Sequence, residues 1–211
     1  GSLVSVAGQI DIQNNEFLTT VSAFGNLPAV GGLVIQQNTR LTNLGGFSNL
    51  SVITGSLIIG DNISLTCLSG FANLTTVTLS MIIRNNPSLG SISGLANLRR
   101  VGTLNIQNNI SLVNLDGANS LQTILNGFDI EQNPLLQNIN GISNIDTGMQ
   151  TPAFIVWALA RHCSLRQIAN WEDAERTERL LRAARAYDEA RAEGRILDDV
   201  AFAPDAGREN D

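Results

Sequence analysis

The chain contains no lysine, since all thirteen of its basic residues are arginine. Two interpretations stay open: a genome rich in G and C, or selection against lysine modification. Charged residues make up only 15% of the sequence, and the formal net charge is −6. Because nucleic-acid phosphates attract basic surfaces, this balance argues against a nucleic-acid partner.

Side chains that carry chemistry are also scarce. The two cysteines, Cys67 and Cys163, lie 96 positions apart, so they make neither a disulfide framework nor a metal site, although a single bridge between them stays open. The only histidine, His162, precedes Cys163, and adjacent residues on a helix point about 100° apart, which suits a thiol nucleophile and its base poorly. No glycine-rich phosphate loop or carboxylate pair stands out. We therefore expect a protein that is not an enzyme and that uses no cofactor and no metal.

Long apolar runs are missing as well. The longest one in the last third of the chain, 153–160, has eight residues, whereas a membrane-spanning helix needs about 20. We therefore expect no membrane span.

What the chain does contain is a repeated frame, Φ-x-Φ-x-x-Asn-x-x-Leu-x-x-Φ, in which Φ is an apolar residue. It returns six times, at spacings of 23, 24, 24, 23 and 24 residues. A fixed period in this range predicts a solenoid. The asparagines of the six copies, here called the asparagine ladder, are Asn15, Asn38, Asn62, Asn86, Asn109 and Asn133.

Apolar residues occupy seven columns, at offsets −5, −3, +3, +6, +9, +12 and +15 from the ladder asparagine. The columns at −5 and −3 predict the inward face of a short strand, since alternate residues of a strand share a face. Stacked coils would place each strand beside a parallel one about 4.8 Å away. The pattern predicts a right-handed parallel β-solenoid of about six coils of 23–24 residues.

The repeated residues also resemble a known family. The unit Val30-x-x-Leu33-x-Ile35-x-x-Asn38-x-x-Leu41 is similar to a leucine-rich repeat in which the leucine after the asparagine is moved by one place. The run that begins Gly46-Phe-x-Asn-Leu resembles the receptor L-domain variety more closely, and the likeness covers about residues 4–148. That variety occurs in the ligand-binding ectodomains of insulin and epidermal-growth-factor receptors, and related repeats occur in fungal cell-wall and bacterial surface proteins. The resemblance implies an extracellular or cell-surface binding module, while a cytoplasmic location stays open. The cysteine-rich modules of the receptors are missing here, so a growth-factor-receptor role is not implied.

Two polar columns predict structural roles. We expect the ladder asparagines to bond backbone groups that would otherwise be buried unpaired. The alternative is glycosylation, because Asn49, Asn62, Asn73 and Asn109 each begin an acceptor motif. If both columns point inward, these four side chains cannot be modified. The second column consists of Asn26, Asn49, Asn73, Asn97, Ser120 and Asn144.

The candidate functional site is the strand face that points away from the core. Val34, Ile58 and Ile82 share offset −4 and would lie side by side. An exposed apolar strip with a polar rim is typical of a binding surface. The alternatives are that β-branched residues simply suit a strand, or that a tail segment covers the strip. The candidate residues are Val34, Gln36, Ile58, Ile82, Arg84, Asn105 and Gln107.

A change of composition near residue 150 predicts a boundary. Four arginines and seven acidic residues precede it, and nine arginines and twelve acidic residues follow. We expect a repeat domain at 3–149, a helical segment at 150–197 and a disordered acidic tail at 198–211. The helical segment is interpreted as a cap on the last coil, as a helix (165–193) that pairs with another chain, or as a segment foreign to the repeats.

These patterns predict a non-enzymatic recognition module that binds a protein or a glycan through the outward face of its sheet. The alternative is a structural or assembly protein, in which the 165–193 helix drives homo-oligomerisation and the solenoid is a spacer.

Overall fold

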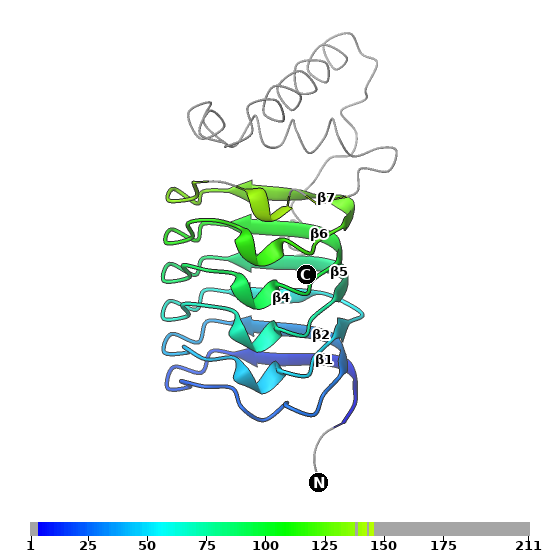
Figure 1. Cartoon of the computed structure of the whole chain (residues 1–211). Coiled ribbons are helices and arrows are strands. Elements are labelled where there is room, and N and C mark those ends of the chain that lie inside the picture. The colour runs from blue at the N-terminus through cyan, green and yellow to red at the C-terminus, as the bar shows by residue number, and fades with distance from the viewer. Residues whose placement is uncertain (1–3, 138, 143, 146–211) are drawn as a thin grey trace, which may run out of the picture.

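The described part of the chain is a parallel β-solenoid (Figure 1). Its structure is a computed structural model that describes residues 4–137, 139–142 and 144–145. Within these residues the solenoid has six levels of strand and makes about five turns, which confirms the predicted parallel solenoid with slightly fewer turns than the six coils expected. The predicted helical segment at 150–197, with its 165–193 helix, and the predicted tail at 198–211 lie outside the described residues.

The strands form one sheet along the solenoid axis, and every pairing in it is parallel. Two short strands, β3 and β4, both pair with β2 and β5 and together make one level. Neighbouring strands are in register by the repeat period, so that Leu33 lies beside Leu57 and Leu57 beside Met81. The strands are β1 (Val6–Gln13), β2 (Ala29–Gln36), β3 (Val52–Ile53), β4 (Leu57–Gly60), β5 (Thr76–Arg84), β6 (Arg100–Gln107) and β7 (Thr123–Glu131).

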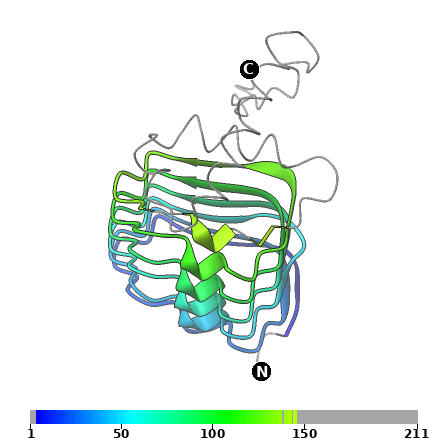
Figure 2. The same ribbon diagram turned by 45° about the horizontal axis from the view of Figure 1, so that its top comes forward.

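A column of short 3₁₀ helices lies opposite the sheet across the core (Figure 2). In the first coil a turn at residues 23–26 takes this place. The rings of Phe24, Phe47 and Phe71 stack along the column, with centroids 5.2 Å and 5.6 Å apart. The helices are η1 (Gly45–Phe47), η2 (Ser69–Phe71), η3 (Ser93–Leu95), η4 (Asp116–Ala118) and η5 (Asn140–Ile142).

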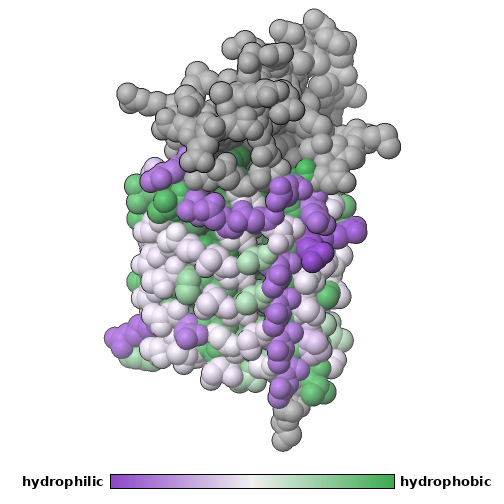
Figure 3. Space-filling view, viewed as in Figure 1, coloured by the Kyte–Doolittle hydropathy of each residue, from purple (hydrophilic) through white to green (hydrophobic). Residues whose placement is uncertain are grey.

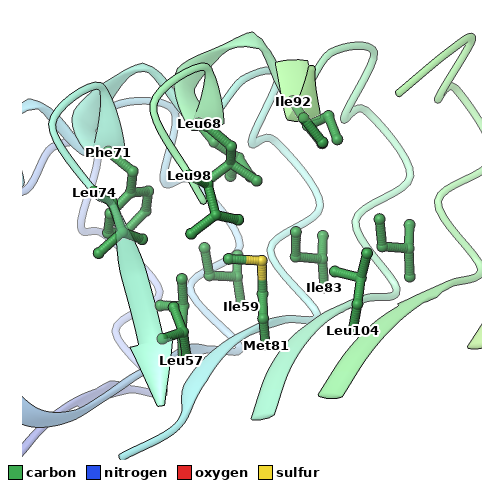
Figure 4. Close-up of a cluster of buried hydrophobic side chains, with 14 of the residues drawn as sticks. Leu57, Ile59, Leu68, Phe71, Leu74, Met81, Ile83, Ile92, Leu98 and Leu104 are labelled. Carbon is green, nitrogen blue, oxygen red and sulfur yellow. The ribbon is translucent and has the colours of Figure 1, made fainter. Parts of the chain in front are cut away.

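The predicted apolar columns make the core. Strand residues such as Leu57, Met81 and Leu104 face residues such as Phe71 and Leu98 from the opposite wall (Figure 4). The core side chains of the inner coils are buried, because each inner coil has a neighbouring coil packed on both sides. In the first coil, the residues Ile10, Ile12, Leu18 and Phe24 are only partly buried.

The asparagine ladder is structural, as predicted, and Asn86 shows how it works. Its Nδ2 donates hydrogen bonds to Ile59 O of the preceding coil at 3.1 Å and to Arg84 O of its own coil at 2.9 Å. Its backbone N–H donates to Asn109 Oδ1 at 3.2 Å, and its own Oδ1 accepts from the backbone N–H of Asn62 at 3.2 Å. These bonds satisfy backbone groups that the turn would otherwise bury unpaired. The side chains of Asn38, Asn62, Asn86 and Asn109 are fully buried, and Asn133 is nearly so.

The second polar column corrects one prediction. Its side chains do not point inward, since Asn49 and Asn73 are exposed. The amide of Asn49 donates to Gly25 O, and that of Asn73 donates to Ser48 O at 2.7 Å. The column therefore ties successive coils together from outside the core, where a polar amide needs no burial. The predicted inaccessibility holds for Asn62 and Asn109 and is wrong for Asn49 and Asn73.

A glycine column lets the 3₁₀ helices stack closely. In η3, a Cβ placed on Gly94 would lie 1.8 Å from Leu68 O, and on Gly70 in η2 it would lie 1.8 Å from Leu44 O. No side chain fits at such a distance, so only glycine allows the approach. The column comprises Gly46, Gly70, Gly94, Gly117 and Gly141.

Candidate binding face of the sheet

The outward residues of the strands form two straight rows across the sheet, because the strands are in register. The first row contains the predicted apolar strip, with Val34 beside Ile58 and Ile58 beside Ile82. It reads Asp11, Val34, Ile58, Ile82, Asn105 and Asp129. The second row reads Gln13, Gln36, Gly60, Arg84, Gln107 and Glu131. The structure therefore brings all seven predicted site residues onto adjoining positions of one face.

The apolar strip is less exposed than the sequence predicts. Val34 is 6% exposed, and Ile58 and Ile82 are half-buried. Side chains on neighbouring strands lie about 5 Å apart and cover one another, which a single strand pattern does not show. Val34 therefore supports the strip from one end, while Ile58 and Ile82 offer its accessible surface.

Gly60 shapes the second row at the centre of the sheet. A Cβ at this position would lie 3.1 Å from Gln36 Nε2 and 3.4 Å from Arg84 Cγ. The side chains of Gln36 and Arg84 therefore lie close to Gly60 from either side, in space that a larger residue would take. Arg84 is exposed and supplies the positive charge of the face.

The end of the face near β7 is polar and rich in acceptors. Gln107 Nε2 donates to Asp129 Oδ2 at 2.8 Å. Asn105 Oδ1 and Asp129 Oδ1 are buried and accept no hydrogen bond, although the two residues are partners across β6 and β7. Buried polar atoms normally have a partner, and these two oxygens are closed to a ligand, which would instead meet the accessible parts of Asn105, Gln107 and Asp129. Asp129 is absent from the predicted site, although the −4 column of the repeat contains it.

A row of left-handed residues follows each strand. All six have φ between 53° and 57°, a conformation that asparagine and aspartate tolerate best among residues with a side chain. Their side chains extend the polar rim: Asn85 Nδ2 donates to Asp61 Oδ1 at 2.9 Å, and Asn108 Nδ2 donates to Asn85 Oδ1 at 2.8 Å. The sequence places this column on the outward face but does not reveal the turn. The row consists of Asn14, Gln37, Asp61, Asn85, Asn108 and Gln132.

The opposite wall of the solenoid has a different surface. Viewed from the side of the 3₁₀ helices, it is mostly of intermediate hydropathy and is crossed by a narrow hydrophilic column along the solenoid axis (Figure 3). The sheet forms the far wall in this view (Figure 1), and its strands carry the apolar strip. The two walls therefore differ, and the apolar strip belongs to the sheet.

The part of the chain that the structure describes contains no candidate metal site. No group of three or more His, Cys, Asp or Glu residues there could hold a metal ion. Cys67 is a free, half-buried thiol whose Sγ lies 3.7 Å from Ser69 Oγ. Burial raises its pKa, but hydrogen bonds from Ser69 and Thr66 lower it, and the net pKa is below the usual value. His162 and Cys163 lie outside the described residues, and no described helix is long and apolar enough to cross a membrane.

Comparison with known proteins concerns the end of the chain. Residues 149–211 match the sequence model of a domain of unknown function (DUF8352). No curated protein and no solved structure matches the chain. The DUF8352 match covers less than half of the chain and none of the described residues, so the family of the repeats stays a prediction.

Proposed function

We propose that the repeats form a non-enzymatic recognition module, which binds a protein or a glycan through the outer face of its parallel sheet. One observation carries the proposal: the half-buried Ile58 and Ile82 adjoin a polar end formed by Asn105, Gln107 and Asp129. Apolar area supplies affinity, and the polar groups beside it supply specificity. The proposal includes the right-handed receptor L-domain type of the repeats and an extracellular or cell-surface location, both of which rest on the resemblance.

The scaffold supports this function because it holds the face rigidly. The strands that carry the face are fixed from behind by the core and at their ends by the buried ladder asparagines. A preorganised surface loses little conformational entropy when it binds. Exposed side chains on such a sheet can therefore vary without disturbing the fold, as binding modules require.

The apolar part of the face is tested with the double variant Ile58→Asp/Ile82→Asp. We expect ligands found with a glycan array and a displayed protein library to bind at least tenfold more weakly, because two charges would be desolvated at the centre of the contact. The matched control is Ile63→Asp/Ile110→Asp, since these isoleucines are 51% and 47% exposed away from the two rows. If the double variant keeps its circular dichroism spectrum and every ligand binds unchanged, the sheet face is not the site.

The polar end is tested with Asp129→Asn. The new Nδ2 can donate to Asn105 Oδ1 across β6 and β7, so we expect the free energy of unfolding to rise by about 1 kcal/mol. A ligand that donates to the carboxylate should bind several-fold more weakly to this variant. Chemical denaturation and titration of a library ligand measure the two effects, with the exposed Asp116→Asn as the control. Unchanged binding would remove Asp129 from the site.

A further inference from the structure

Among the described residues, none packs against the outer side of the first coil, residues 4–27. Ile10, Ile12, Leu18 and Phe24 are only partly buried there, whereas the equivalent residues of the inner coils, such as Leu41, are fully buried. A hollow of ≈ 750 Å³ opens among Ile12, Leu18 and Phe24, and its lining also includes Asn15, Phe17 and Val21. Phe17 is 77% exposed, the most of the large apolar residues that the structure describes.

The same end carries unused hydrogen-bonding groups. Asn14 N–H donates to Gln36 O of the next coil. The backbone N–H and C=O of a residue at offset −2 from the ladder asparagine, such as Gln36, therefore point towards the preceding coil. In the first coil that residue is Gln13, and by the alternation of a strand Asp11 and Gln9 face the same way. Their N–H groups therefore line the free edge of β1. The asparagine ladder also ends here. Asn15 N–H donates to Asn38 Oδ1 of the next coil, but no described residue donates to Asn15 Oδ1.

Edge strands in soluble proteins are normally protected by lysine, proline, inward charges or cover. β1 reads Val-Ala-Gly-Gln-Ile-Asp-Ile-Gln, with one charge and no proline or lysine. The exposed side of the first coil corresponds to the surface through which each inner coil packs against the preceding coil. In the inner coils, another copy of the repeat covers this surface. We propose that it is filled by the first coil of a second copy of this chain, to give a two-fold symmetric dimer.

A two-fold axis that runs just outside the first coil, alongside the middle of β1 and the turn at 23–26, satisfies the geometry. The sheet and the 3₁₀ column lie on opposite sides of the core (Figure 2), so this axis brings β1 against the partner's β1 in the antiparallel sense and each Phe24 towards the other. The two hollows then close upon each other and the two cores become continuous. The buried coil, residues 4–27, falls within the roughly 20–30 residues a side of a standard interface. The closed symmetry ends the assembly at two copies, whereas head-to-tail stacking would form a fibre.

The proposal is tested on the whole chain by sedimentation velocity and amide hydrogen exchange between about 1 and 100 μM, a range that spans micromolar dissociation constants. We expect a species of twice the 22.6 kDa chain mass at high concentration. The amides of Asp11 and Gln13 should become protected as this species forms. The variant Gln9→Lys/Asp11→Lys should remain monomeric, because it brings four positive charges together at the junction. It changes only outward side chains, so its circular dichroism spectrum should be unchanged.

The control is Thr78→Lys/Gln122→Lys, which adds charge at exposed positions outside the first coil and should dimerise normally. A chain that stays monomeric throughout overturns the proposal. So does a dimer in which the Asp11 and Gln13 amides exchange quickly at every concentration, since another surface would then hold it. The outer rows of the sheet stay accessible in this dimer, so failure of the dimer leaves the proposed binding face standing.

Discussion

Replacing Gly94 with alanine is expected to lower the free energy of unfolding by about 3 kcal/mol, with more than that if the stack cannot relax. The added Cβ would lie 1.8 Å from Leu68 O and 2.2 Å from Leu68 C in the preceding coil. These are backbone atoms, so relief requires η2 and η3 to move apart. In a solenoid each coil is stabilised mainly by its neighbours, and such a separation weakens the interface at the middle of the stack. Urea denaturation followed by circular dichroism measures the change.

Gly90→Ala is the matched control, since it makes the same substitution four positions earlier in the same coil. The nearest atom to its added Cβ, Ser111 O, lies 3.8 Å away, which is an ordinary contact. We expect a change within about 0.5 kcal/mol. Equal effects of the two substitutions would show that the close approach of the 3₁₀ helices does not exist.

Replacing Asn86 with alanine is expected to cost about 3–5 kcal/mol, because it leaves several buried backbone groups without partners. Ile59 O loses its donor at 3.1 Å, Arg84 O its donor at 2.9 Å, and the backbone N–H of Asn62 its acceptor at 3.2 Å. These groups lie in the interior of the stack, where water cannot reach them to replace the hydrogen bonds of the lost amide. Thermal and urea denaturation measure the loss.

Asn15→Ala is the control from the exposed end of the same ladder. Its Nδ2 donates to Gln13 O at 2.9 Å and to Asn38 Oδ1 at 3.1 Å, but water reaches these groups. At concentrations where the chain is monomeric, we expect a loss of less than about 1 kcal/mol. Equal losses in the free energy of unfolding for Asn86→Ala and Asn15→Ala would show that burial does not strengthen the contribution of the ladder to stability.

The inward columns and the order of the strands are predictable from the sequence because one period fixes both. A shift of register by one residue would move Ile59 and Ile83 from the core to the surface, and the six-fold repeat excludes that error. The inward role of the ladder follows from the same reasoning, since an asparagine after each strand lies beside backbone groups that would otherwise be buried unpaired. The helical segment after residue 150 lies outside the described residues and stays a prediction.

The close contacts between coils were harder to predict. The glycines of the 3₁₀ column recur as regularly as the leucines, and their spacing is the signal that could have revealed the stacked helices. The exposed position of Asn49 and Asn73 was mispredicted, because an amide that bonds the preceding coil from outside has the same spacing as one that bonds it from within.

The site was predictable in its arrangement and not in its accessibility. The repeat places Val34, Ile58 and Ile82 side by side, and the register confirms this. How far neighbouring side chains cover Val34, and how Gln107 turns to bond Asp129, depend on rotamers that no periodicity fixes. The unpartnered oxygens of Asn105 and Asp129 therefore emerge only from the three-dimensional structure.

The central claim is that six strand levels lie in register, with the offset −4 residues in one outward row. Distances between paired spin labels test it most directly, in chains whose cysteines at 67 and 163 are replaced by serine. Labels at positions 11 and 129 are separated by five strand steps, or about 24 Å, and labels at 11 and 105 by four, or about 19 Å. With an excess of unlabelled chain to suppress contacts between copies, we expect the two distributions to differ by about 5 Å. Equal distances for the two label pairs, or a distance beyond about 40 Å between labels at 11 and 129, would contradict the stacking of the strands in register.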